Sequence, residues 1–118
     1  MTSVGNPGDA RLSVEAFHDE NAAWIIIHGE ADIANVDHLE AALDSIHLDG
    51  AKTVKLQVSD LTFVDVAALR QLTTFTRRMK QGGRTVLTVG ARPTLQRMAT
   101  ELDVQDELGL PRPGLINP

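Results

Sequence analysis

The sequence contains no cysteine and no tyrosine, and aromatic residues make up only 3% of its 118 residues. The absence of cysteine excludes disulfides, thiol catalysis and cysteine-ligated zinc. The scarcity of aromatic rings means that the core must be built from aliphatic side chains. Hydrophobic residues make up 42% and charged residues 23%, as in an ordinary folded domain, so a chain of this length predicts one domain.

Long apolar runs and an excess of basic charge are also missing. No stretch approaches the roughly 20 apolar residues that span a bilayer. Residues 1–9 have neither the basic start nor the apolar centre of a signal peptide. The net charge of −5 disfavours contact with nucleic acid or an anionic membrane. We therefore expect a cytoplasmic protein that neither contacts nucleic acid directly nor inserts into a membrane.

One basic cluster departs from this acidic balance, formed by Arg77, Arg78, Lys80 and Arg84. Cations are favourable near the C-terminus of a helix, which favours a solvated helix end. The alternative is a docking patch for an acidic partner.

The apolar pattern predicts the element order β-β-α-β-α-β-α. Residues 11–17 alternate apolar and polar side chains, as in a half-buried strand. Residues 22–28 are apolar at successive positions, which is typical of a strand covered on both faces. The later elements are a helix over 36–46, a strand over 53–58, a connector over 59–64, a helix over 66–81, a strand over 84–89 and a helix over 93–102.

Alternating strands and helices indicate an α/β fold with a mixed, mostly parallel sheet, to which the opening hairpin adds an antiparallel strand. We expect a single domain over residues 11–108, with helices packed on the sheet. Residues 1–10 are expected to form a flexible N-terminal tail, and residues 109–118 a loose C-terminal tail.

Two groups of residues are candidates for sites of chemistry. His28, Glu30 and Asp32 share the spacing of a strand face, and a histidine with two carboxylates can bind a metal or transfer protons. They cross the end of a strand, however, where Asp32 fits better as a helix cap. Gly82 and Gly83 follow a helix, whereas a phosphate-binding loop precedes one. We expect no metal, no cofactor and no catalytic site.

Two stretches carry a resemblance to a known family. The first is Gly29-Glu30-Ala31-Asp32, followed by an amphipathic helix; the second is the alternating strand and connector that run from Val54 to Asp65, immediately before the second helix. Here the sequence resembles the STAS domain, which is named for sulfate transporters and anti-sigma-factor antagonists. The resemblance covers residues 11–108.

The resemblance implies a non-enzymatic protein that binds an anti-sigma factor and so frees a sigma factor. The family continues after the aspartate with Ser-[Ser/Thr]-Gly-Leu, but this chain has Val66-Ala67-Ala68-Leu69, of which only Leu69 matches. In partner-switching members an anti-sigma-factor kinase phosphorylates that first serine, and the modification releases the kinase. Val66 has no oxygen to accept a phosphoryl group, which implies an antagonist that is not switched at this position.

The expected interface is the junction over residues 62–69, together with the exposed face of the second helix and the loop after Gly29. Asp65 is expected to cap this helix. Thr62 is the alternative phosphosite, although a loop threonine more often bonds local backbone groups. The residues expected to bind a kinase-like anti-sigma factor are Asp32, Thr62, Asp65, Val66, Ala67, Ala68 and Leu69.

Other functions stay open at this stage. A stand-alone STAS subunit could regulate or scaffold a larger assembly, such as a transport ATPase or a stress-sensing complex. A small enzyme or ligand carrier with a flavodoxin-like core is a third hypothesis, which the lack of a catalytic constellation disfavours. The plainer interpretation of Val66, Ala67 and Ala68 is that they are packing residues. For the oligomeric state, a monomer and a dimer both stay open.

Overall fold

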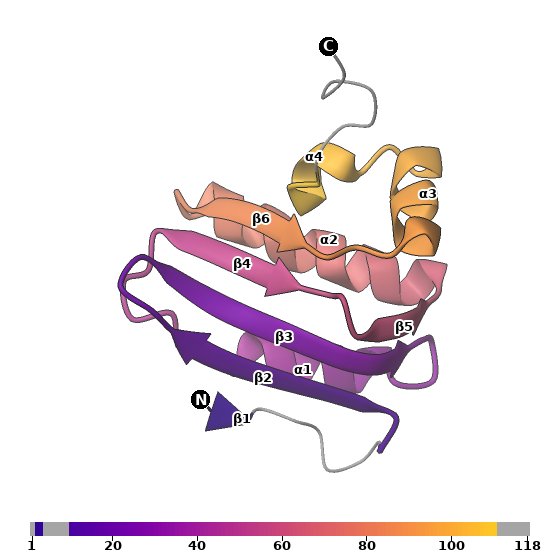
Figure 1. Cartoon of the computed structure of the whole chain (residues 1–118), viewed down its shortest axis with the longest axis horizontal. Coiled ribbons are helices and arrows are strands. Elements are labelled where there is room, and N and C mark those ends of the chain that lie inside the picture. The colour runs from indigo at the N-terminus through magenta and orange to yellow at the C-terminus, as the bar shows by residue number, and fades with distance from the viewer. Residues whose placement is uncertain (1, 4–9, 111–118) are drawn as a thin grey trace.

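The computed structural model describes residues 2–3 and 10–110, with side chains from residue 10 onward. It is a mixed β-sheet with helices against one face (Figure 1). The strands are β1 (Thr2–Ser3), β2 (Leu12–His18), β3 (Ala22–Ala31), β4 (Thr53–Gln57), β5 (Leu61–Val64) and β6 (Thr85–Val89), and the helices are α1 (Val36–Asp44), α2 (Val66–Gln81), α3 (Pro93–Glu101) and α4 (Gln105–Leu108).

The sheet has the strand order β1-β2-β3-β4-β6, and β5 pairs with the end of β3 beyond β4. Strands β1, β2 and β3 pair antiparallel, whereas β4 and β5 run parallel to β3, and β6 runs parallel to β4. Parallel neighbours need crossover connections, which α1 and α2 supply. The α/β class and the mostly parallel sheet predicted from the sequence are therefore confirmed.

The core lies between the sheet and the helices and is aliphatic apart from Phe75, as the scarcity of aromatic residues predicts. Alternate residues of the strands point into it, and Ile25, Ile27 and Leu56 are fully buried there. Helices α1 and α2 contribute Leu39 and Leu72. Burial of each such side chain stabilises the fold by about 1.5–3 kcal/mol, so this layer holds the helices against the sheet.

Strand β3 is longer than its sequence pattern predicts. Gly29 does not end the strand, which continues to Ala31 with an irregularity in pairing between Gly29 and Glu30. Gly29 has φ +101°, and a Cβ atom built there would lie 1.8 Å from the carbonyl oxygen of Arg11. Glycine is therefore required at this position because β2 passes too close for any side chain.

The predicted connector over residues 59–64 contains a strand, β5, so that prediction was wrong. Strand β5 is recognisable only by its pairing with β3, because Leu61 and Val64 are buried while Thr62 and Phe63 are exposed. This pattern lacks the alternation by which a strand is predicted from sequence.

Described residues on both sides of the predicted 11–108 domain also contact the sheet. Helix α4 was not predicted, and Leu108 and Leu110 are 1% and 8% exposed. The amide of Thr88 donates to the carbonyl of Gly109 at 3.2 Å, which places residues 109–110 against β6. At the other end Thr2 and Ser3 pair with β2. The remaining residues of the two predicted tails, 1, 4–9 and 111–118, lie outside the described residues.

The turn between β2 and β3 is fixed by one carboxylate. Asp19 accepts hydrogen bonds from the amides of Asn21 and Ala22 and from the indole Nε1 of Trp24, at 2.8–2.9 Å. The bond from the Asn21 amide, with those from Trp24 and Ala22, lowers the pKa of Asp19 below 3.8. A lowered folded pKa means that this stabilisation is present above pH 3.8 and is lost as the pH falls through the lowered value.

The prediction that β3 is covered on both faces was wrong for the described chain. Ile25 and Ile27 are buried under the helices, but Trp24 and Ile26 on the opposite face are only partly buried. In Figure 1, α1 and α2 lie behind the sheet, and α3 and α4 lie beyond its β6 edge. Within residues 2–3 and 10–110 no helix combines the length and apolar character needed to cross a bilayer.

Candidate partner-binding site

The two motif segments meet at one end of the sheet. Strand β5 pairs with the last residues of β3, so that Phe63 lies opposite Glu30 and Val64 opposite Ala31. The amide of Asp65 then donates to the carbonyl of Ala31 at 3.2 Å. As a result, the loop that follows β3, residues 32–35, lies beside the N-terminus of α2 at the right of Figure 1.

Asp65 connects the loop to the helix through both oxygens of its carboxylate. Oδ1 accepts from the amide of Ala68 at 2.9 Å, so the predicted cap of α2 is confirmed. Oδ2 accepts from the amide of Ile33, also at 2.9 Å, a bond across 32 residues that the sequence does not reveal. The carboxylate therefore fixes Ile33 next to the first turn of α2.

Asn35 organises the same loop from inside. Its side chain is fully buried; Oδ1 accepts from the amide of Asp32 at 2.8 Å and Nδ2 donates to the carbonyl of Glu30 at 2.9 Å. Asp32 Oδ1 accepts a hydrogen bond from the amide of Ala34. Asp32 Oδ2 accepts one from Nη1 of Arg11 at 3.0 Å. Asn35 is the N-cap residue of α1, but its side chain makes no cap hydrogen bond. The side chains of Asn35 and Asp32 hold the loop instead.

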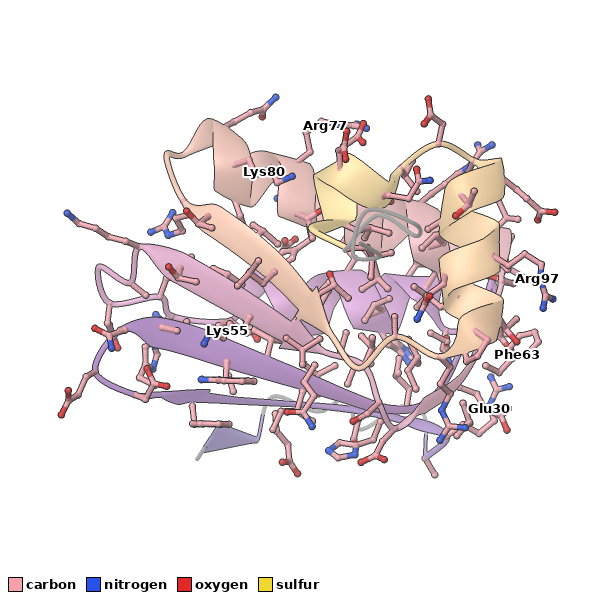
Figure 2. The ribbon with its side chains drawn as sticks, turned by 45° about the horizontal axis from the view of Figure 1, so that its top comes forward. Glu30, Lys55, Phe63, Arg77, Lys80 and Arg97 are labelled. Atoms are coloured by element: carbon pink, nitrogen blue, oxygen red, sulfur yellow. The ribbon has the colours of Figure 1, made fainter. Side chains whose placement is uncertain are left out.

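Three large apolar side chains are exposed around this junction. Ile33 of the loop is 74% exposed, Phe63 of β5 51% and Val66 of α2 42%. We refer to Ile33, Phe63 and Val66 as the junction patch. Figure 2 shows Phe63 at the rim of the molecule near Glu30, its partner in the strand pairing. Apolar side chains grouped on an exposed surface are typical of a protein-binding site.

The predicted interface residues divide into exposed and buried ones. Val66 and Thr62 are exposed, and Asp32, Asp65 and Ala67 are half-buried. Ala68 and Leu69 are fully buried in the core, so their side chains anchor α2 and are not available to a partner. The structure thus corrects the interface predicted from the sequence at these two positions.

The hydroxyl of Thr62 donates to the carbonyl of Gly29 at 3.1 Å. This bond joins β5 to β3 across 33 residues, so it is not the local backbone bond expected of a loop threonine. Ile33 and Phe63 were missed as individual site residues. The sequence contains a signal for each. Ile33 is a β-branched apolar residue in the loop over residues 32–35, and Phe63 is a large aromatic residue within the second motif.

The structure does not bring His28, Glu30 and Asp32 together. His28 Nδ1 lies 3.3 Å from Asp60 Oδ2, whereas both Glu30 and Asp32 face Arg11. In residues 10–110 no three histidine or carboxylate side chains are grouped as a metal site. The metal hypothesis gains no support from the geometry.

The basic residues at the end of α2 contact groups of the chain itself. Arg78 pairs with Asp44 at 2.7 Å and Arg77 with Glu107 at 3.8 Å. Lys80 donates to a carbonyl of α4, and Arg84 Nε donates to the carbonyl of Ala51 at 3.0 Å. These contacts favour the interpretation of a helix end over that of a docking patch.

Replacing Asp65 with alanine is expected to reduce the free energy of unfolding by about 2 kcal/mol, because it removes a helix cap and the bond to Ile33. Urea denaturation measures the loss. Asp65→Asn keeps one acceptor oxygen and is expected to recover about half of it. If Asp65→Ala unfolds at the same urea concentration as the unmodified chain, the carboxylate does not hold the junction together.

Comparison with known proteins identifies the family. Residues 14–112 match the family model described as "Mlab, STAS domain". The chain belongs to the STAS domain family. No curated protein matches the sequence.

Solved structures show the same STAS fold. An anti-sigma factor antagonist from Mycobacterium paratuberculosis is 16% identical, with a TM-score of 0.71 over 92% of this chain and 90% of that one. The antisigma-factor antagonist STAS domain from Rhodobacter sphaeroides is 19% identical, with a TM-score of 0.60 over 69% and 88%. The phosphorylated form of the Bacillus cell fate determinant SpoIIAA is 14% identical, with a TM-score of 0.61 over 86% and 92%.

Proposed function

We propose that this STAS domain is a non-enzymatic anti-sigma-factor antagonist of the cytoplasm. It binds a kinase-like anti-sigma factor through the junction patch and so releases a sigma factor for transcription. The observation that carries the proposal is the exposure of Ile33, Phe63 and Val66 at the junction of the two family motifs. The similar folds of several anti-sigma-factor antagonists support it.

The junction patch has the physical properties of a protein-binding site. Burying apolar area stabilises a complex by about 25 cal/mol per Å², and an exposed phenylalanine or isoleucine offers a large area to a partner. The side-chain oxygens of Asp65 and Asn35 accept hydrogen bonds from backbone amides of the loop that carries Ile33, so this loop is already held in place. Little conformational entropy is therefore lost when the partner binds.

Val66 explains how this antagonist would differ from a switched one. It lies in the first turn of α2, where the helix dipole favours a phosphate, but its side chain has no acceptor oxygen. A phosphate at this position would oppose binding because an apolar contact would have to desolvate nearly two negative charges. The patch stays uncharged, so we propose that protein level, ligand binding or competition between partners regulates binding.

The test is to capture proteins with a tagged copy of the chain and identify them by mass spectrometry. The expected result is a kinase-like anti-sigma factor, which is then incubated with the purified chain and ATP. No phosphate is expected on the chain, because Val66 lacks a hydroxyl and that of Thr62 bonds Gly29. Stoichiometric phosphate on Thr62 would show that the antagonist is switched after all.

A second candidate is a regulatory or scaffold STAS subunit of a larger assembly, such as a transport ATPase or a stress-sensing complex. The specific observation in its favour is again Val66, because a permanent subunit needs no phosphate-driven release. The same capture distinguishes the two functions. Recovery of a transport ATPase, without any sigma-associated protein, would replace the first proposal with the second.

A further inference from the structure

The face of the sheet opposite the helices is open. Its residues alternate along the strands with those that point into the core. None of the helices described lies over it in Figure 1, and Figure 2 shows Lys55 on the strands, away from the helices. This open sheet face consists of Ser13, Glu15, Phe17, Trp24, Ile26, His28, Thr53, Lys55, Gln57, Thr85, Leu87 and Val89.

Apolar side chains cross this face from β2 to β6. The strand pairing places Phe17 beside Trp24, then Lys55, then Leu87 in one row. The rings of Phe17 and Trp24 stack with centroids 5.9 Å apart, and Lys55 Nζ lies 4.9 Å from the Trp24 ring centroid. Leu87 is 42% exposed. The lysine therefore lies along the tryptophan and leaves the row largely apolar.

A second row runs beside the first. It places Glu15 next to Ile26, then Gln57, then Val89, which is 38% exposed. The two rows together span four strands with apolar residues at both sides and at the centre. Such a surface is unfavourable in water and is typical of an interface.

The sequence of β3 also indicates that a second layer packs on the open sheet face. Its successive apolar residues over 22–27 are those of a strand buried on both faces, but the described chain covers only the face of Ile25 and Ile27. The central strand therefore has the composition of a strand that is buried on both faces, whereas residues 2–3 and 10–110 bury only one of them.

The shape and charge of the face select its partner. Four strands side by side offer a broad layer, which fits another sheet stacked about 10 Å away better than a helix in a groove. Apart from His28, the strand residues of the face include one acid, Glu15, and one base, Lys55. The carboxylates of Asp19 and Asp60 lie beside them, against Trp24 and His28. A surface that carries charges of both signs can pair with a second copy of itself across a two-fold axis. A partner with a strong charge of one sign would leave the like charges on this face unpaired.

We propose that the open sheet face binds a second copy of this chain, giving a homodimer in which two sheets stack face to face. The junction patch lies at the end of the sheet and on α2, outside this interface. Each copy would therefore keep its proposed partner-binding site, and the dimer does not depend on the proposed function.

Sedimentation equilibrium of the purified chain over roughly a hundredfold concentration range tests the proposal. We expect the mass to rise from 12.8 kDa toward twice that value. Trp24 is the only tryptophan and lies within the face, so its emission should shift to shorter wavelength as the dimer forms. A monomer over the whole range would overturn the proposal.

Leu87→Glu locates the interface. The new carboxylate would stand opposite Lys55 in the strand pairing, an arrangement that the folded monomer tolerates, but the dimer would have to bury it. We expect dimerisation to weaken at least tenfold, with an unchanged circular dichroism spectrum. Leu102→Glu, at a residue 38% exposed and outside the face, should leave the dimer intact. A dimer indifferent to Leu87→Glu, or equally weakened by Leu102→Glu, would overturn the proposal.

Discussion

Replacing Gly29 with alanine is expected to lower the free energy of unfolding by about 3 kcal/mol. Gly29 has φ +101°, where an L-residue is strained, and the new Cβ would lie 1.8 Å from the Arg11 carbonyl oxygen. That carbonyl accepts the amide of Glu30 at 2.9 Å, so it cannot move away without breaking the pairing of β2 with β3. Urea denaturation measures the effect.

Gly50→Ala is the matched control. Gly50 also has a positive φ, +78°, but a Cβ there meets no atom within 4 Å. Only the backbone strain remains, so we expect a loss of about 1 kcal/mol. If the two alanine variants lose the same free energy of unfolding, the close approach of β2 to Gly29 is not what requires glycine.

Val66→Glu is expected to weaken binding of the anti-sigma factor about a hundredfold, or roughly 3 kcal/mol, because the complex would bury an unpaired carboxylate. The fold should be unaffected, since Val66 is 42% exposed and a negative charge is favourable in the first turn of a helix. Isothermal titration with the captured partner measures the affinity, and urea denaturation confirms the stability.

Val89→Glu provides the same change of side chain at a similarly exposed valine, 38% against 42% for Val66. Val89 lies on the open sheet face, so its substitution should leave the affinity for the anti-sigma factor unchanged. Equal losses of affinity in the two variants, or no loss in Val66→Glu, would show that the junction patch does not contact the partner.

Most of the fold could be predicted because its elements have strong local signals. Helix α2 shows this best: apolar residues recur from Leu69 to Phe75 at helical spacing, Asp65 caps the start and Gly82 follows the end. Strand β5 could not be predicted, because it is defined by hydrogen bonds to β3 about 32 residues away. Helix α4 has only four residues, too few to show a period.

The exposed junction patch lies in the region that the sequence predicts as the interface, but the predicted residues are not all exposed. Four successive residues, Val66 to Leu69, complete about one helical turn, so they cannot all face a partner; the helix buries Ala68 and Leu69. Helical geometry alone predicts that part of this segment is buried. The orientation of Ile33 was not foreseeable, because a hydrogen bond from its amide to Asp65, distant in sequence, sets it.

Photo-crosslinking in the cell tests the role of the junction patch most directly. Phe63 is 51% exposed, so benzoylphenylalanine can replace it with little effect on packing. Irradiation is expected to join the chain to a kinase-like anti-sigma factor, and the same probe at Leu87 is expected not to capture that protein. No adduct from position 63, or capture of the same protein equally from position 87, would contradict the assignment of Ile33, Phe63 and Val66 as the docking surface.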